Sequence, residues 1–142
     1  GGKRMLPIAA QQADIVGVTA NLRAGEVGPD AVDDLGPEKF DEKLEWVRAA
    51  AGDRMDDIEL NCLVMSTQIT DDRQAALEGT GAMFGMDAET VGQTPILLIG
   101  STDQIADHLR ERRERWGFSY IIVQSMETVE ALRPVVAELA GT

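Results

Sequence analysis

The sequence has one cysteine and one histidine, and these shortages exclude several kinds of site. Cys62 lies inside an apolar run, so no disulfide can form within the chain and no cysteine pair indicates a metal centre. A reducing cytosol is the expected setting, and Cys62 is expected in the core. His108 lies between Asp107 and Leu109 in a predicted helix, where a surface position is favoured over catalysis or metal binding. No Ser-His-Asp triad or catalytic carboxylate pair stands out by spacing.

Basic residues and long apolar runs are also scarce. Thirteen Lys and Arg residues stand against 25 Asp and Glu residues, which gives a formal charge of −12. A chain this acidic is repelled by phosphate backbones and by anionic lipid headgroups, so nucleic acid and membrane surfaces are poor candidate partners. No apolar run approaches the roughly 18 residues that indicate a membrane span. The acids and bases alternate along the predicted helices, which is typical of solvated helix faces.

The chain has 142 residues, 44% of them hydrophobic, which is enough for one domain with a substantial core. A complete (β/α)8 barrel typically needs about 250 residues, so a barrel of this kind would be only partly contained in residues 1–142. The sequence begins at Gly1 without an initiator Met. We therefore expect the natural start of the protein to lie upstream.

Short apolar runs alternate with amphipathic stretches along the whole chain. Strands are predicted at residues 15–18, 58–65 and 120–123, and helices at 3–12, 37–51, 70–84, 103–116 and 129–139. The run at residues 95–100 is either a strand or a buried connection. Such alternation predicts an α/β fold in which the three strands are parallel neighbours. Periodicity alone does not separate an open α/β sheet from part of a closed barrel.

Three stretches resemble the luciferase-like monooxygenase family, and within it a subgroup of probable F420-dependent oxidoreductases. They are GGKRMLPIAAQQADIVG at residues 1–17, IGSTDQIADHL at residues 99–109 and RRERWGFSYI at residues 112–121. Thr102-Asp103 departs from the family pattern, which usually has Pro after the Gly-Ser or Gly-Thr pair. The resemblance implies the C-terminal half of a (β/α)8 TIM barrel, with the first four or five strands outside this chain.

The resemblance also implies a cofactor and a site for it. The parent would be an oxidoreductase or monooxygenase that uses coenzyme F420, or alternatively FMN, and transfers hydride between this cofactor and a small organic substrate. The turn formed by Gly1, Gly2, Lys3 and Arg4 would hold the cofactor phosphate, because glycines let backbone amides approach an anion and the next helix offers free N–H groups. Catalytic residues are expected on the absent half and stay unassigned, so the fragment alone is expected to be inactive.

The barrel geometry also indicates which connections could carry a site. In a barrel the chemistry sits where each strand leads into the next helix, here at residues 1–4, 19–36, 65–70 and 124–127.

A cut barrel exposes two sheet edges and an apolar sheet face, so we expect pairing with the missing N-terminal half or homo-oligomer formation. Alternatively, Gly1-Gly2 is a cloning remnant or a simple tight turn. The chain is then a small open α/β sheet that acts as a self-contained acidic interaction or regulatory domain without catalysis.

Overall fold

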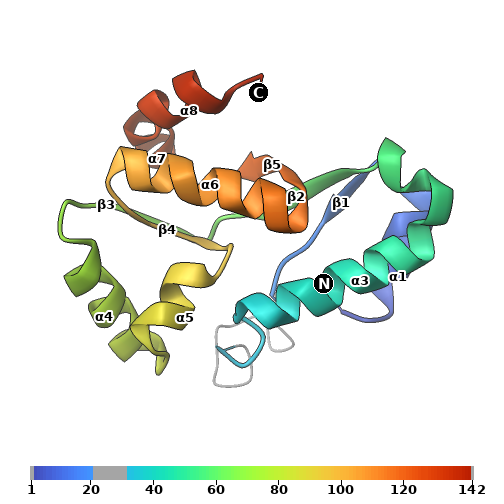
Figure 1. Cartoon of the computed structure of the whole chain (residues 1–142), viewed down its shortest axis with the longest axis horizontal. Helices are drawn as coiled ribbons and strands as arrows, with labels where there is room; N and C mark the ends of the chain where they lie inside the picture. The colour runs from blue at the N-terminus through green and yellow to red at the C-terminus, as the bar shows by residue number, and fades with distance from the viewer. Residues whose placement is uncertain (1, 21–31, 142) are drawn as a thin grey trace.

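The computed structural model describes residues 2–20 and 32–141, and it is an α/β structure in which helices cover parallel strands (Figure 1). Within these ranges no helix has the length and apolarity to cross a membrane. The elements are α1 (Met5–Gln12), β1 (Ile15–Gly17), α3 (Pro37–Ala51), the 3-10 helix η1 (Gly52–Asp57), β2 (Glu59–Leu63), β3 (Ser66–Ile69), α4 (Arg73–Phe84), α5 (Ala88–Gln93), β4 (Leu97–Gly100), α6 (Thr102–Trp116), β5 (Phe118–Ile122), α7 (Met126–Ala131) and α8 (Arg133–Leu139).

The three strands predicted from the sequence form one parallel sheet in the order β1-β2-β5. Gly17 is in register with Asn61, and Asn61 with Tyr120. The predicted parallel arrangement is therefore confirmed. Helical crossovers join these strands, as parallel neighbours require.

A second, two-stranded sheet corrects the sequence prediction at residues 65–70. This segment was predicted as a connection, but Ser66–Ile69 is strand β3 and pairs in parallel with β4. The ambiguous run at residues 95–100 therefore contains a strand. Most side chains of β3 are exposed, and three of its four residues are polar, so no apolar alternation marked it in the sequence. Backbone pairing with β4 holds the strand, starting at the Met65 amide, which donates to the Ile96 carbonyl.

The larger core lies between the strands and the helices α1, α3 and α6. Phe40 and Trp116 meet with ring centroids 6.1 Å apart, and Phe118 lies 6.5 Å from Phe40 and 6.0 Å from Trp116. All three rings are buried. We call these three residues the aromatic cluster. It joins α3, the end of α6 and the start of β5, and such tilted ring pairs add stability beyond their buried area.

A smaller core lies under the C-terminal helices. Ile105 of α6 and Val135 of α8 pack there against Val64 and Leu98, which come from the strand region. In Figure 1, α7 and α8 lie at one end of the molecule, away from α1 and α3. The two C-terminal helices have 6 and 7 residues, against 15 for α3 and α6. They bury correspondingly few side chains.

The helix ends follow local rules, with two corrections, the first being that the single helix predicted at 129–139 is divided into α7 and α8. Ser101 begins α6 with a capping box, since its hydroxyl accepts from the Gln104 amide while the Gln104 side chain accepts from the Ser101 amide. Gly117 ends α6 at φ 81°, a left-handed conformation that favours glycine. The helix predicted to begin at Thr70 begins later, because Asp72 is its cap and accepts from the Ala75 amide.

Candidate functional site

A polar cavity of about 210 Å³ lies where β2 passes into β3 and where β5 leads into α7. These are the carboxyl ends of two neighbouring parallel strands, the side on which α/β folds usually place their sites. The Val64 amide donates to the Ile122 carbonyl and holds the two strands together beside the cavity. The lining side chains are Val64, Met65, Ser66, Thr67, Gln124, Ser125 and Thr128.

Most of the cavity wall consists of hydroxyl and amide groups. Ser125 caps α7 by accepting from the Thr128 amide, and its hydroxyl also donates to the Thr128 hydroxyl at 2.9 Å. The Thr67 hydroxyl oxygen is buried and makes no hydrogen bond to any residue in 2–20 or 32–141. A buried hydroxyl without a partner is costly, so this position favours a ligand or a water that can bond to it.

The chemistry of this cavity is therefore binding and orientation. Its lining contains no Asp, Glu, His, Lys, Arg or Cys, so within the lining no side chain can act as an acid, a base or a metal ligand at neutral pH. In the described ranges, no cluster of three or more His, Cys, Asp and Glu side chains is arranged to hold a metal ion. Hydroxyl and amide groups suit a neutral polar ligand or the polar edge of a ring system.

The N-terminal turn predicted to hold a phosphate leads into α1. Gly1 lies outside the described residues, so the structure describes Gly2, Lys3 and Arg4 of the predicted site. The Gly2 carbonyl accepts from the Met5 and Leu6 amides and closes the turn, and no side chain caps the helix at Arg4. The Lys3 ammonium lies 5.8 Å from the centroid of the Trp46 ring of α3. Lys3 and Arg4 are exposed and form no ion pair within the described chain.

The turn and the polar cavity belong to different parts of the fold. The turn precedes α1, which packs against α3 and β1, whereas the cavity lies at the ends of β2 and β5. Sequence reasoning placed 65–70 and 124–127 among the candidate connections, and the structure brings residues of both segments together in the cavity. It did not single out Thr67. The signal in the sequence is the polar run Ser66-Thr67-Gln68 directly after a buried strand.

Lys43 is a buried cation that sequence reasoning missed. Its side chain is almost completely buried, and its ammonium donates to the Asp34 carboxylate at 2.5 Å and to the Thr19 carbonyl at 3.1 Å. These contacts join α3 to the chain beyond β1. The signal was available, because Lys43 lies three residues after Phe40 and next to Leu44, on the buried stripe of α3.

Arg112 is an exception to the expectation that the charged residues of the helices lie on solvated faces. It is 4% exposed and donates to the carbonyls of Thr94, Pro95 and Leu97. Burial lowers the pKa of Arg112 to about 10. Arg112 lies between Ile105 and Trp116 on the inward stripe of α6, which is the sequence signal for its burial. We interpret Arg112 as a structural residue that holds the segment leading into β4 against α6.

Cys62 and His108 complete the set of distinctive side chains. Cys62 is buried, as expected, and burial raises the pKa of its thiol to about 11, so it is not poised as a nucleophile. His108 is half-buried rather than on the open surface, and its Nε2 lies 3.1 Å from an Arg73 guanidinium nitrogen. Burial and then the Arg73 charge lower the pKa of His108. The pair joins α4 to α6.

No family model and no curated protein matches the sequence. Among solved structures, the chain is similar to the long-chain alkane monooxygenase LadA, with a TM-score of 0.58 and 14% identity over 96% of this chain and 39% of that one. It is also similar to the monooxygenase RslO1 from Streptomyces bottropensis, with a TM-score of 0.53 and 15% identity over 96% and 44% of the two chains.

A third similar structure is the coenzyme F420 dependent tetrahydromethanopterin reductase from Methanopyrus kandleri. Its TM-score is 0.58 and its identity 17%, over 96% of this chain and 47% of that one. The chain thus spans less than half the length of each of these three proteins. At these identities the similarity establishes the fold alone, and that fold is part of a luciferase-like TIM barrel with parallel strands in an open sheet.

Proposed function

We propose that the chain is the C-terminal half of a luciferase-like oxidoreductase, that its cofactor is coenzyme F420 in preference to FMN, and that the turn at residues 1–4 binds the cofactor phosphate. The observation that carries the proposal is the structural match of 96% of this chain to two monooxygenases and an F420-dependent reductase. The preference for F420 rests on the resemblance of residues 1–17, 99–109 and 112–121 to one subgroup.

The described part of the turn fits a phosphate group. Two exposed cations, Lys3 and Arg4, stand at the start of an eight-residue helix whose first turn has no side-chain cap. The Met5 and Leu6 amides already donate to the Gly2 carbonyl, so the two cations and the positive end of the helix dipole are what favour an anion at this position. Trp46 lies under the Lys3 ammonium and restricts its position without neutralising its charge.

When bound, the cofactor would supply the hydride chemistry, and the protein would supply orientation. The polar cavity is the second element that we assign to this role. Thr67 and Gln124 offer hydrogen-bonding groups at the carboxyl ends of β2 and β5 without a charge that would compete for a proton. We propose that they orient the organic substrate or the polar edge of the cofactor ring.

The test is a cofactor titration that isolates the phosphate. The longest natural protein that contains this chain is titrated with F420 and FMN. It is also titrated with the deazaflavin and flavin chromophores that lack a phosphate. Replacing Lys3 and Arg4 with Ala should weaken F420 binding about tenfold or more, since a lost charge-assisted hydrogen bond costs roughly 1.5–3 kcal/mol. Binding of the phosphate-free chromophores should be unchanged.

A matched control removes two exposed cations elsewhere. Among the described residues, Lys39 and Arg133 each pair with a nearby acid on the surface, and replacing both with Ala changes the net charge equally. This variant should bind both cofactors as the wild type does. If the Lys3 and Arg4 variant also keeps its full affinity, the side chains are not in the site. If neither F420 nor FMN binds the wild type, the oxidoreductase assignment fails.

We further propose that the open face of the sheet is covered by the missing N-terminal half of the barrel, or by a second copy where that half is lacking. Ile15, Tyr120 and Ile122 are exposed on strands β1 and β5, with Tyr120 at 42%. On the middle strand β2, Glu59 is in register with Ile15, and Asn61 is in register with Tyr120 and donates to its carbonyl. Three exposed apolar side chains on one sheet face are typical of an interaction surface.

Sedimentation equilibrium of the 142-residue chain at micromolar concentration tests this surface. A dimer is expected, and Ile122→Lys should shift it toward monomer because a charge is costly to bury in an apolar interface. Arg133→Gln is a control outside the sheet. A compact wild-type monomer with cooperative unfolding would instead favour the self-contained acidic α/β domain, a non-catalytic interaction or regulatory unit.

A further inference from the structure

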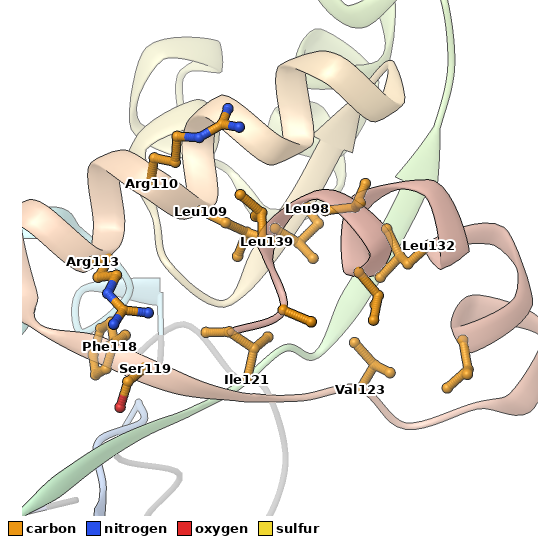
Figure 2. Close-up of a pocket in the computed structure, with 14 residues that line it drawn as sticks. Leu98, Leu109, Arg110, Arg113, Phe118, Ser119, Ile121, Val123, Leu132 and Leu139 are labelled. Atoms are coloured by element: carbon orange, nitrogen blue, oxygen red, sulfur yellow. The ribbon is translucent and has the colours of Figure 1, made fainter. Parts of the chain in front are cut away.

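A second, apolar cavity lies between α6, β5 and the two C-terminal helices. Its volume is about 250 Å³, and it shares no lining residue with the polar cavity. Figure 2 shows Leu109 and Leu139 close together near its centre, with Ile121 on the neighbouring strand. Aliphatic side chains from β4, α6, β5, α7 and α8 form most of its wall. Val136 at its rim is 56% exposed, so the short C-terminal helices leave the cavity open.

Such a space favours an apolar occupant. A water molecule inside it would find few hydrogen-bond partners, because most of the lining side chains are aliphatic. Filling it with a hydrocarbon chain removes the apolar walls from water, which contributes about 25 cal/mol for each Å² buried. A cavity of about 250 Å³ that is open on one side has room for a hydrocarbon chain of medium length.

The rim carries two arginines that differ in their partners. Arg110 forms ion pairs with Asp107 and Glu138, so its charge is already matched. The Arg113 guanidinium makes no hydrogen bond or ion pair with residues 2–20 or 32–141. In Figure 2 Arg113 lies beside Phe118 and Ser119 at one end of the cavity. Arg113 is exposed, so its charge is available to an anionic group of a ligand at the mouth of the apolar cavity.

We propose that this cavity binds a free medium-chain carboxylate, with its hydrocarbon tail among Leu109, Ile121 and Leu139 and its carboxylate at Arg113. A guanidinium matches a carboxylate with two parallel hydrogen bonds, which a single hydroxyl group cannot accept. The chain's charge of −12 opposes binding to an anionic bilayer, so the occupant is a free molecule rather than a membrane lipid. This proposal does not depend on the oxidoreductase assignment.

The test compares octanoate with octanol, which has a similar tail but no charge. Both are titrated into the 142-residue chain, and methyl resonances are followed by NMR. Octanoate should bind saturably and shift the methyl groups of Leu109, Ile121 and Leu139. It should bind about threefold to tenfold more tightly than octanol. This ratio lies between the contributions expected of a fully exposed and of a fully buried ion pair. Equal affinity for the two ligands, or shifts confined to Leu44 and Val47 of the larger core, would overturn the proposal.

Three variants separate the charge from the cavity. Arg113→Gln should reduce octanoate binding to the level of octanol and leave octanol binding unchanged, while Arg133→Gln, which removes a cation away from the lining, should change neither. Ile121→Phe fills the cavity and should weaken both ligands. If that variant loses cooperative unfolding, Val129→Phe at the exposed rim replaces it. The proposed site is wrong if Arg113→Gln still prefers octanoate over octanol. It is also wrong if the variant with the filled cavity binds both ligands as tightly as the wild type.

Discussion

The aromatic cluster and the C-terminal helices lie on the same sheet but are packed differently. Around Phe40, Trp116 and Phe118 the rings fill the space between two 15-residue helices, and no side chain of the cluster is exposed. Under α7 and α8 the helices are short and a cavity of about 250 Å³ stays open. Helix length explains the difference, because a helix of two turns presents too few apolar side chains to close a layer. Stability is therefore expected in the first region and ligand binding in the second.

The largest expected effect comes from truncating the aromatic cluster. Phe40→Ala should lower the free energy of unfolding by about 3–5 kcal/mol, because Trp116 and Phe118 cannot move far enough to fill the space. Val136→Ala in α8 should change it by about 0.5 kcal/mol or less, since this side chain is already more than half exposed. Urea unfolding followed by tryptophan fluorescence measures both. Similar losses in the two variants would remove the distinction between the regions.

Helix α3 and strand β3 show how far the sequence could predict the structure. The stripe that contains Phe40 and Leu44 predicts α3 correctly, because helical periodicity reports burial directly. Strand β3 could not be predicted in this way, since Ser66, Thr67 and Gln68 are held by backbone pairing with β4, and backbone groups are alike in every sequence. The polar cavity depends on that pairing. Only its candidate segments, 65–70 and 124–127, could be identified beforehand.

Buried cations mark a second limit of sequence reasoning. Arg112 and Arg113 are neighbours with the same side chain, yet one donates to three buried carbonyls and the other lines the apolar cavity. The residue type does not distinguish them. Their position around the helix axis does, because Arg112 lies on the same face as Ile105 and Trp116. Lys43 follows the same rule. The turn at residues 1–4 was proposed from a family resemblance, and phosphate binding by Lys3 and Arg4 stays a prediction.

Removing Arg112 should produce the next largest effect. Arg112→Met keeps much of the buried volume but leaves the carbonyls of Thr94, Pro95 and Leu97 without this donor, and we expect a loss of about 2–3 kcal/mol in the free energy of unfolding. Arg113→Gln is the matched control and should change the stability by about 0.5 kcal/mol or less. Urea unfolding measures both variants. If Arg112→Met is as stable as Arg113→Gln, the three hydrogen bonds contribute no net stability.

The smallest expected effect is a dependence on pH at the edge of the aromatic cluster. Asp41 accepts hydrogen bonds from Arg115 at 2.5 Å and from the Trp116 indole nitrogen at 2.6 Å. The hydrogen bond from Arg115 lowers the pKa of Asp41 most, and Trp116 lowers it further against the opposing effect of burial. The ionised carboxylate is thus favoured by folding. Its stabilising effect is complete above the unfolded-state pKa of about 3.9 and is lost as the pH falls through the lower pKa of the folded state.

Asp41→Asn should remove this dependence while keeping an oxygen that accepts from Trp116. At neutral pH the variant should be less stable than the wild type by about 1 kcal/mol or less, because the Asp41 side chain is 40% exposed and water screens the pair with Arg115. The difference should shrink toward zero when urea unfolding is repeated down to about pH 3. Glu130→Gln in α7 should keep the wild-type dependence, since its pair with Arg133 lies on the exposed surface of the C-terminal helices. A constant difference between Asp41→Asn and the wild type would mean that the carboxylate charge does not stabilise the aromatic cluster, and that its hydrogen bonds act through geometry alone.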